Sequence, residues 1–575
     1  MKKRWTYDPP DGELLDRLVY DLRISPLLAR LLVNRGINDP DSAHAFLQPK
    51  MTHLSNPLEC PEMEKAARRL VKAVKAGEKI AVYGDYDVDG VTGTAQLLLF
   101  FGLLKANTTW YIPQRIDEGY GLNHDAIERL KSEGVDIIVT VDCGITSIAE
   151  ADKIRAEGID LIITDHHEPG SELPVALAIV NPKVPDSGYA FKEFSGAGLA
   201  FRLCWALAEV LSRQRKVAPQ FREFLLEAMG LAALGTVADS VPLMGENRVI
   251  VKHGLEFLSK SAQPGIQALK EVSNLRGPRL TTKDVGFILG PRLNAAGRMW
   301  DAAFSLELLT TEHSEKAKRL AVHLERYNRE RQKIQAEMLD STREKIENEI
   351  DLDSTRVIVL ESESWHPGVI GIVASRLVDE FYRPAIMIAI RGDEGLGSAR
   401  SVPGFHLPVA LEASRSKLIS FGGHSQAAGL KIKREDVGDF RHLVNKYAFA
   451  DMKEEDLQPT LHTDGELAFR GISVSGVREL ELLAPHGVGN PEPVFVARDL
   501  RIVGEPCRVG GQSGRHLSFY LRQGDVSFRA IAFSMGEMLA QAKQHPGPVS
   551  IVFAPKISYW RDEAVELEIK DIRFD

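Results

Sequence analysis

The feature that most constrains the fold is a regular alternation of short apolar segments with amphipathic ones between residues 61 and about 180. Five apolar runs have the length and β-branched composition of buried strands: KIAVY (79–83), TTWYIP (108–113), DIIVTV (136–141), LIIT (161–164) and ALAIV (176–180). Helical segments separate them. Apolar strands that alternate with helices predict a mainly parallel sheet covered on both faces. Functional residues of such sheets lie at the carboxyl ends of the strands.

The pattern changes four times along the chain. Residues 195 to about 310 have helical periodicity, and 312–350 contain neither Gly nor Pro, which predicts one long charged helix, polar nearly all round, bridging two domains. A second α/β pattern follows, and the tail has the short alternating runs of a small β-barrel. We therefore predict an N-terminal segment (1–55), a catalytic domain (56–311), the connecting helix (312–350), a smaller α/β domain (351–450) and a barrel (455–575).

The segment YGDYDVDG (83–90) places Asp85, Asp87 and Asp89 on alternate positions directly after a predicted strand. Like charges this close repel one another, so a bound cation is the natural reason for the cluster. A calcium-binding EF-hand begins in the same way, but its twelfth loop position is a bidentate Glu and here is Gln96. The EF-hand is also preceded by a helix, so we reject that interpretation.

Three further motifs carry acidic or histidine side chains near strand or helix ends. They are TVDCG with Asp142, TDHHE with Asp165, His166 and His167, and GTVADSVPL with Asp239. Each alone is most simply a cap or turn residue. Together they could gather at one sheet edge, where carboxylates without basic partners indicate metal. Many carboxylates, an imidazole and no thiolate favour Mn²⁺ or Mg²⁺ over zinc, and their number suits the two-ion arrangement that hydrolyses phosphoesters.

Composition restricts the classes of protein to which the chain could belong. The four cysteines lie far apart, which argues against a disulfide framework or zinc site, and the longest apolar run is too short for a membrane span. No signal peptide is expected, and we expect a soluble cytoplasmic protein. The net charge of −9 is unusual for a nucleic-acid binder, yet residues 276–298 carry five basic side chains against one acidic one. That run is equally compatible with a solvated face.

The motifs also carry a resemblance. DYDVDG, VDCG, TDHH and GTVADS, in this order, resemble the four motifs of the DHH phosphoesterase superfamily, and GGHSQAAG (422–429) resembles the signature of its companion DHHA1 domain. With PQRIDEGYGL, LGPRLNAAGRM, WHPGVIGIVASRL and GSARS, the chain is similar nearly end to end to the bacterial single-strand-specific 5′→3′ DNA exonucleases of this superfamily. The resemblance implies an α/β multidomain protein: a parallel-sheet DHH domain, a long connecting helix, a smaller α/β DHHA1 domain and a C-terminal OB-like barrel.

For the metal site, the resemblance implies two divalent cations that share Asp142. One ion would be held by Asp87 and Asp142, the other by Asp89, Asp142, His166 and Asp239. Asp85 is a further candidate ligand, because it matches the motif. Asp165 would orient His166 as a partner of a metal-bound imidazole, and His167 would face the scissile phosphate.

For DNA, the resemblance implies a pocket for the 5′-terminal phosphate built from Arg298, Ser398, Arg400 and His424. Gly422 and Gly423 would expose backbone N–H groups there, although these two glycines taken alone are more simply explained by an ordinary tight turn. Arg115 and Tyr120 would contact nucleotides. In the tail, the aromatic candidates for base stacking are Tyr520, Phe528, Tyr559 and Trp560, of which some should fill the barrel core.

The expected activity is degradation of single-stranded DNA from the 5′ end to mononucleotides, in DNA recombination and repair. Expected partners are single-stranded DNA, a single-strand-binding protein and a helicase, with no membrane; we expect a monomer. One alternative is a small-substrate phosphoesterase or nano-RNase on the same fold, and the β-rich tail argues against it. The other is a replication-fork scaffold without catalysis, which should have lost metal carboxylates that this chain keeps.

Overall fold

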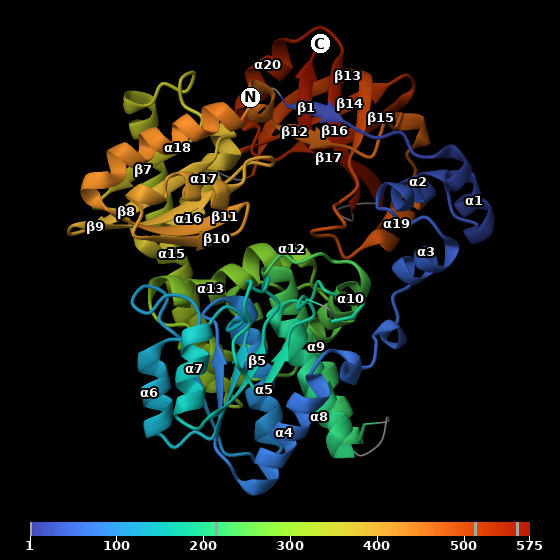
Figure 1. The fold of residues 1–575 in the computed structure, drawn as a ribbon. Helices are drawn as coiled ribbons and strands as arrows, with labels where there is room; N and C mark the ends of the chain where they lie inside the picture. The colour runs from blue at the N-terminus through green and yellow to red at the C-terminus, as the bar shows by residue number, and fades with distance from the viewer. Residues whose placement is uncertain (1–2, 186, 213–216, 511–513, 559–562) are drawn as a thin grey trace. The chain divides into compact units, whose positions relative to one another are not determined.

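The computed structural model describes residues 3–575 except 186, 213–216, 511–513 and 559–562. Its contacts divide the chain into two compact units. The first comprises Ser55–Val241 and His253–Pro459, and the second comprises Lys2–Leu54, Pro242–Lys252 and Thr460–Asp575. Both units contain segments distant in sequence, as the colours of Figure 1 show for the blue N-terminal and red C-terminal segments of the second unit.

The first unit contains the predicted parallel sheet. Its strands are β2 (Ile80–Gly84), β3 (Thr108–Tyr111), β4 (Ile137–Val141), β5 (Asp160–Thr164) and β6 (Ala178–Val180). They lie in the order β3-β2-β4-β5-β6, and every neighbouring pair is parallel. The chain therefore runs outward from β2 to β3 and then crosses back to β4. After β2 and after β4 the chain continues toward opposite faces of the sheet. Sheets of α/β proteins bind ligands at such a switch point.

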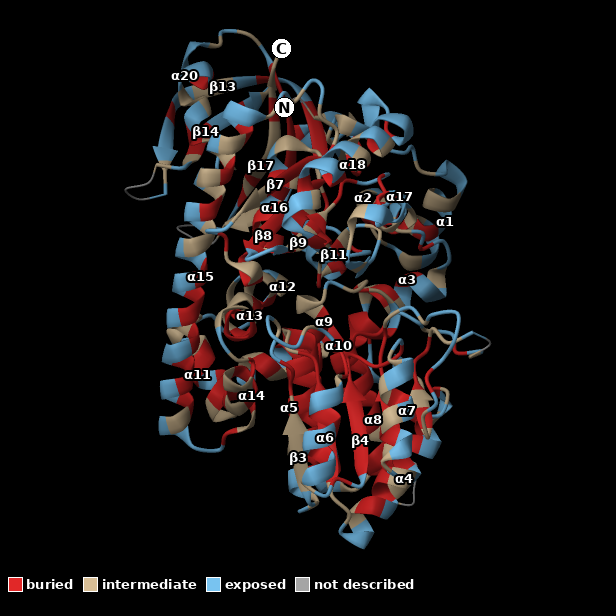
Figure 2. Ribbon diagram, turned by 60° about the vertical axis from the view of Figure 1, so that its left-hand side comes forward, coloured by how far each residue is buried: buried red, intermediate tan, exposed pale blue. Residues whose placement is uncertain are grey.

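Helices cover both faces of this sheet. One face packs on α6 (His124–Ser132) and α7 (Ile148–Ala156), through a core that includes Ala81, Ile138 and Leu161. The other packs on α5 (Val88–Leu103) and α8 (Gly196–Ser212), with α4 (Met63–Ala76) and α9 (Pro219–Ala238) against them. Successive strand residues point to opposite faces, so strands covered on both sides must be apolar throughout. In Figure 2, β4 is accordingly buried along its whole length.

The long helix α15 (Ser314–Glu349) confirms the prediction of a single helix over 312–350. It is not polar nearly all round, however. Buried side chains recur at each turn from Ala317 to Arg331 and again from Met338 to Ile346, which gives the helix one buried stripe. The stripe exists because α15 packs on α11 (Pro264–Val272), α13 (Gly290–Met299), α14 (Ala303–Thr310) and α16 (Pro367–Phe381). A π-helical turn, η3 (Val285–Leu289), joins α12 (Thr282–Asp284) to α13.

The same unit holds a second, mixed sheet in the order β10-β11-β9-β8-β7. Its strands are β7 (Ile358–Ser362), β8 (Ala385–Arg391), β9 (Glu394–Arg400), β10 (Ser420–Gly423) and β11 (Ala427–Lys433). Only β7 and β8 pair in parallel. The helices α17 (Leu407–Ala413) and α18 (Val437–Asp451) share a core with it, and α16 packs on β8 and β9.

The second unit is built around a closed barrel, as the tail pattern predicted. Its strands, in the order β13-β14-β15-β17-β16, are β13 (Phe495–Val509), β14 (His516–Gln523), β15 (Val526–Ala532), β17 (Ala564–Phe574) and β16 (Val549–Ser558). The remaining helices of the tail are α19 (Val474–Leu480) and α20 (Leu539–Gln544). Helix α10 (Gly245–Lys260) begins in this unit and ends in the first.

The N-terminal segment joins the barrel. Strand β1 (Arg4–Thr6) pairs in parallel with β12 (Thr460–His462), and α1 (Gly12–Leu22), α2 (Pro26–Asn34) and α3 (Pro40–Leu47) share the barrel's hydrophobic core. The Trp5 indole also donates to the Asp571 carboxylate at 2.6 Å. Nothing in the local sequence pattern predicted this pairing of the two ends. Across the described residues, no helix combines the length and the apolar character needed to cross a bilayer.

Candidate metal and DNA site

The loop after β2 is shaped by its own carboxylates. Asp87 caps α5: its Oδ1 accepts the N–H groups of Asp89 at 2.9 Å and Gly90 at 3.2 Å. A Cβ on Gly90 would lie 2.6 Å from the backbone nitrogen of Asp85, so only glycine permits this close return of the chain. The motif D-x-D-x-D-G thereby makes a tight strand-to-helix connection that holds all three carboxylates at the sheet edge.

Asp142 follows β4 in a left-handed conformation with φ of 64°, which is costly for a residue other than glycine. Its N–H donates to the Thr164 carbonyl at 3.0 Å, and its carbonyl accepts the Tyr120 hydroxyl at 2.9 Å. Gly196 at the start of α8 packs directly on it, since a Cβ there would lie 2.5 Å from the Asp142 Cβ. The backbone of Asp142 is thus held on three sides and its carboxylate is aimed by the fold.

Asp89 is buried under the amino end of α8. Its Oδ2 accepts the Gly196 N–H at 2.5 Å and its Oδ1 accepts the Ala197 N–H at 2.9 Å. The partial positive charge of a helix amino end stabilises a carboxylate in this position. Each oxygen retains a second lone pair that could bind a cation.

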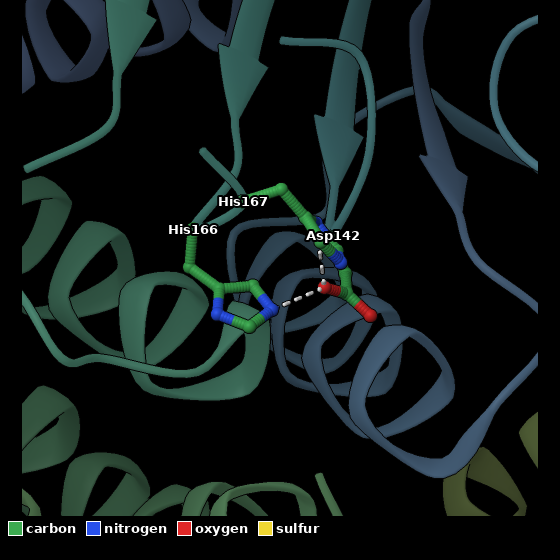
Figure 3. A group of neighbouring side chains, drawn as sticks. All are labelled: Asp142, His166 and His167. Atoms are coloured by element: carbon green, nitrogen blue, oxygen red, sulfur yellow. Dashed lines mark ion pairs between the residues drawn. The ribbon is translucent and has the colours of Figure 1, made fainter. Parts of the chain in front are cut away.

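The His166 ring reaches this cluster from the end of β5, as Figure 3 shows for its approach to Asp142. Its Nε2 lies 3.0 Å from Asp142 Oδ1, 3.6 Å from Asp239 Oδ2 and 3.9 Å from Asp89 Oδ2. Asp239 is the residue that caps the carboxyl end of α9. Burial, and then the neighbouring His167 charge, lower the pKa of His166 to about 3, so the ring is neutral. A neutral imidazole is the form that binds metal.

The buried ligand atoms converge without satisfying one another. Despite their 3.0 Å separation, His166 Nε2 and Asp142 Oδ1 do not have hydrogen-bond geometry, and the buried Asp85 Oδ1 has no hydrogen-bond partner either. Buried polar atoms rarely lack a hydrogen-bond partner unless a bound water, ion or ligand contacts them. The carboxylate-rich donor set matches Mn²⁺ or Mg²⁺. The residues therefore fit divalent cations.

The side chains fall into groups whose donor atoms lie within 4.8 Å of one another. The groups are Asp85, Asp87 and Asp142; Asp89, His166 and Asp239; and Asp142, His166 and His167. Asp142 belongs to two of these groups and contacts His166 of the remaining one, so it lies centrally. This arrangement brings together every predicted metal ligand, including Asp85.

The cluster carries more negative charge than a metal-free interior tolerates. Burial raises the pKa values of Asp85, Asp89 and Asp142 well above the usual range, and repulsion from neighbouring carboxylates adds to the effect. Burial and the Asp87 charge raise the pKa of Asp239 to about 6. Bound cations would remove this repulsion, because they favour the ionised carboxylates.

Asp165 has a different partner from the one predicted. Its Oδ1 contacts Nδ1 of His167 at 2.7 Å and accepts the backbone N–H groups of His166 and His167. Asp165 therefore contacts His166 through the backbone and orients the ring of the second histidine. The Ile145 N–H donates to its Oδ2 at 2.9 Å. Burial alone would lower the pKa of His167, but the hydrogen bond and charge of Asp165 raise it to about 9. His167 is therefore cationic near neutrality.

Four of the predicted DNA contacts form a cationic group in the first unit. The guanidinium of Arg400 donates to Ser398 Oγ at 3.2 Å, and that of Arg298 donates to the Gly368 carbonyl at 3.2 Å. Arg115 stacks on the Tyr86 ring at 4.8 Å. Within the described part of the chain, no carboxylate makes an ion pair with these three arginines. Burial, then mutual repulsion among the arginines, lowers the pKa of Arg298 to about 9. An anion would relieve that repulsion.

The remaining predicted DNA contacts are placed as follows. Gly422 and Gly423 end strand β10, where they pair with Gly429 and Ala428, so they belong to a hairpin and not to an isolated tight turn. The His424 ring that follows stacks on the His167 ring, with the centroids 6.1 Å apart. Tyr120 is half exposed and lies edge-on to His167.

In the barrel, Tyr520 is exposed on β14, whereas Phe528 is half-buried against Phe469. Tyr559 and Trp560 lie outside the described residues.

Two residues that support the site were not predicted from the sequence. Asn294 Oδ1 accepts the N–H of Val88 at 3.2 Å and so steadies the metal-binding loop from α13. Gly196 permits α8 to approach Asp89 and Asp142. Asn294 lies within LGPRLNAAGRM, a motif already recognised, but Gly196 carries no signal beyond its being glycine.

Three domain families match the chain. They are the DHH family, N-terminal domain (79–236), the DHHA1 domain (354–449) and the RecJ OB domain (463–571). The chain is 40% identical over 574 residues to the single-stranded-DNA-specific exonuclease RecJ of Bacillus subtilis, an alignment that covers 99% of this chain and 71% of that protein.

Solved structures agree with these matches. The chain superposes on RecJ of Thermus thermophilus in complex with Mn²⁺, with a TM-score of 0.83, 32% identity, and coverage of 99% of this chain and 79% of the other. For the Mg²⁺ complex of that protein the TM-score is 0.77 with 30% identity, and coverage is 99% and 78%. Together with the ordered motifs and the gathered carboxylates, these similarities show that the chain belongs to the RecJ family of DHH/DHHA1 proteins.

Proposed function

We propose that the chain is a single-stranded-DNA-specific exonuclease that hydrolyses DNA from the 5′ end to mononucleotides, in DNA recombination and repair. The observation that carries the proposal concerns the side chains of Asp85, Asp142 and His166. Their metal-ligating atoms are buried, have no hydrogen-bond partner and meet at the switch point of the sheet. The arginines without acidic partners in the same unit complement a polyanionic substrate.

Two Mn²⁺ or Mg²⁺ ions would be held by Asp85, Asp87, Asp89, Asp142, His166 and Asp239, with Asp142 shared between them. When bound, they supply a hydroxide nucleophile and stabilise the charge that develops on the phosphorus oxygens. The protein's own part is to hold these ligands rigidly, through the caps on Asp87 and Asp89 and the strained backbone of Asp142. No protein nucleophile is required.

His167 is the group that would act directly on the substrate. Asp165 holds Nδ1 of its ring, which leaves Nε2 free to donate a proton in a hydrogen bond to an oxygen of the scissile phosphate. The charged ring would stabilise negative charge in the transition state. Arg298, Arg400, Ser398 and His424 would bind the 5′-terminal phosphate, which restricts cleavage to the end of the strand.

The test is digestion of a single-stranded oligonucleotide labelled at the 5′ or the 3′ end, with Mn²⁺, beside the Asp142→Ala protein. Immediate release of the 5′ label as mononucleotide, a stepwise shrinking 3′-labelled strand and a silent Asp142→Ala protein are expected. Consumption from the 3′ end, or cleavage of very short oligonucleotides only, would favour the small-substrate alternative.

A single-strand-binding protein and a helicase are the proposed partners, because a nuclease of this kind needs an unwound strand. We propose that the chain acts as a monomer. Sedimentation of the protein alone tests the oligomeric state, and sedimentation with a single-strand-binding protein or with a helicase tests each partnership.

A further inference from the structure

A small open cavity of about 130 Å³ lies beside the arginine group of the first unit. It is lined by residues from α9, η3, α13, α15 and α16, among them Gly286, Gly290, Asn294, Arg298, Arg331 and Ile372. Arg298 belongs to the recognised motif LGPRLNAAGRM, whereas Arg331 belongs to none of the recognised motifs. The cavity therefore has a second cationic wall that the proposed function does not use.

Arg331 is more than nine-tenths buried, and its charge has no acidic partner in the described part of the chain. Its guanidinium donates only to neutral groups, the side-chain carbonyls of Asn328 at 2.7 Å and Gln335 at 2.9 Å. Its Nε has no hydrogen-bond partner. A buried charge without a counter-ion is costly, so a group that supplies the charge is expected from outside the protein.

Several other arginines of α15 and its neighbours pair with carboxylates. Glu325 pairs with Arg329 at 2.6 Å and with Arg292 at 2.8 Å. Arg343 pairs with Glu380 at 2.8 Å. These arginines are tied to carboxylates, whereas Arg331, at the cavity, is held by amides that leave its charge uncompensated.

The size of the cavity limits the ligand. A cavity of ~150 Å³ holds one benzene molecule, and a phosphate group is of similar size. A whole nucleotide is several times larger. Two guanidinium groups supply the charged N–H donors that recognise phosphate oxygens.

We propose that this cavity is a second phosphate-binding subsite, in which Arg331 and Arg298 bind a phosphate group beyond the 5′-terminal one. The inference rests on the proposed function, because that function assigns Arg298 to the 5′ end. The occupant is either the next phosphate of a 5′-polyphosphorylated strand or a free phosphate ion. Both present negatively charged oxygens on a tetrahedral phosphorus.

The first experiment measures the subsite without catalysis. Inorganic phosphate is titrated into the full chain in EDTA, and the dissociation constant is measured by calorimetry for the wild type, Arg331→Gln and Arg319→Gln. Arg319 is the matched control: it is an exposed arginine on the same helix, α15, and it does not line the cavity. We expect roughly tenfold weaker binding for Arg331→Gln, the loss typical of one charge-assisted hydrogen bond, and wild-type binding for the control.

Thermal unfolding separates this role from a structural one. Removal of an uncompensated buried charge should leave the melting temperature of Arg331→Gln without phosphate no lower than that of the wild type. The increase in melting temperature caused by phosphate should shrink. Equal phosphate affinities of wild type and Arg331→Gln would overturn the proposal.

The second experiment distinguishes the two sources. Rates are compared for oligonucleotides with a 5′-monophosphate and a 5′-triphosphate. If the occupant is the strand's own phosphate, Arg331→Gln loses about tenfold in kcat/KM on the triphosphate only. If Arg331→Gln changes kcat/KM equally on the two substrates and still binds phosphate more weakly, the occupant is the free ion. A wild type that degrades neither strand would refute the proposed function, and the calorimetry would still decide the subsite.

Discussion

Gly196 offers the sharpest test of how the fold aims the metal ligands. A Cβ at this position would lie 2.5 Å from the Asp142 Cβ and 2.9 Å from its Oδ1, about 0.9 Å short of an ordinary contact of 3.4 Å. Asp142 cannot retreat easily, because its N–H and its carbonyl are both hydrogen-bonded and its φ is already strained. Gly196→Ala should therefore displace either the Asp142 carboxylate or the amino end of α8.

The magnitudes follow from that distance. Overpacking of this kind costs about 1–3 kcal/mol, and the better helix propensity of alanine returns up to ~1 kcal/mol. The free energy of unfolding should fall by about 1–2 kcal/mol. Displacement of a reacting group by ~1 Å can cost about 100-fold in rate, so kcat should fall far more than the stability suggests.

The assay pairs denaturant unfolding with digestion of a 5′-phosphorylated single strand over a range of Mn²⁺ concentrations. Gly198→Ala is the control in the same helix, since its Cβ would meet only ordinary contacts at 3.4 Å and beyond. It should be unchanged in activity and stabilised by up to ~1 kcal/mol. Wild-type stability and Mn²⁺ dependence in Gly196→Ala would refute the reasoning that α8 positions Asp142.

Three further predictions concern protons and metal. Asp165→Asn should lower the pKa of His167 from about 9, so the activity lost near pH 8 should be partly regained at lower pH; a pH profile that falls in parallel with the wild type would contradict this. Mn²⁺ should raise the melting temperature more at pH 8 than at pH 5.5, because protons compete with the metal for the buried carboxylates at the lower pH. Calorimetric scans with Mn²⁺ or with EDTA at the two pH values measure this difference. Burial lowers the pKa of His486 to about 4, below its value in the unfolded state, so the unfolded state binds more protons than the folded state between about pH 6.5 and 4. The free energy of unfolding should therefore fall by up to ~3 kcal/mol as the pH is lowered through this range. Urea unfolding of His486→Gln should show a weaker pH dependence, and an unchanged dependence would assign the effect to other groups.

Local sequence determined much of this protein. The apolar runs predicted every strand of the parallel sheet, because strands covered on both faces must be apolar throughout. The spacing of Asp85, Asp87 and Asp89 after a strand predicted their position at its carboxyl end. These features depend only on neighbouring residues, so they are legible in the sequence.

Tertiary structure alone decided the features that join distant residues. The pairing of β1 with β12, the approach of α8 to Asp142, the contact of Asp165 with His167 in place of His166, and the burial of Arg331 all depend on how whole elements pack. Periodicity states that a face is buried but not what buries it. For this reason the metal ligands could be predicted as a set, whereas the groups that hold them in place could be found only in the folded structure.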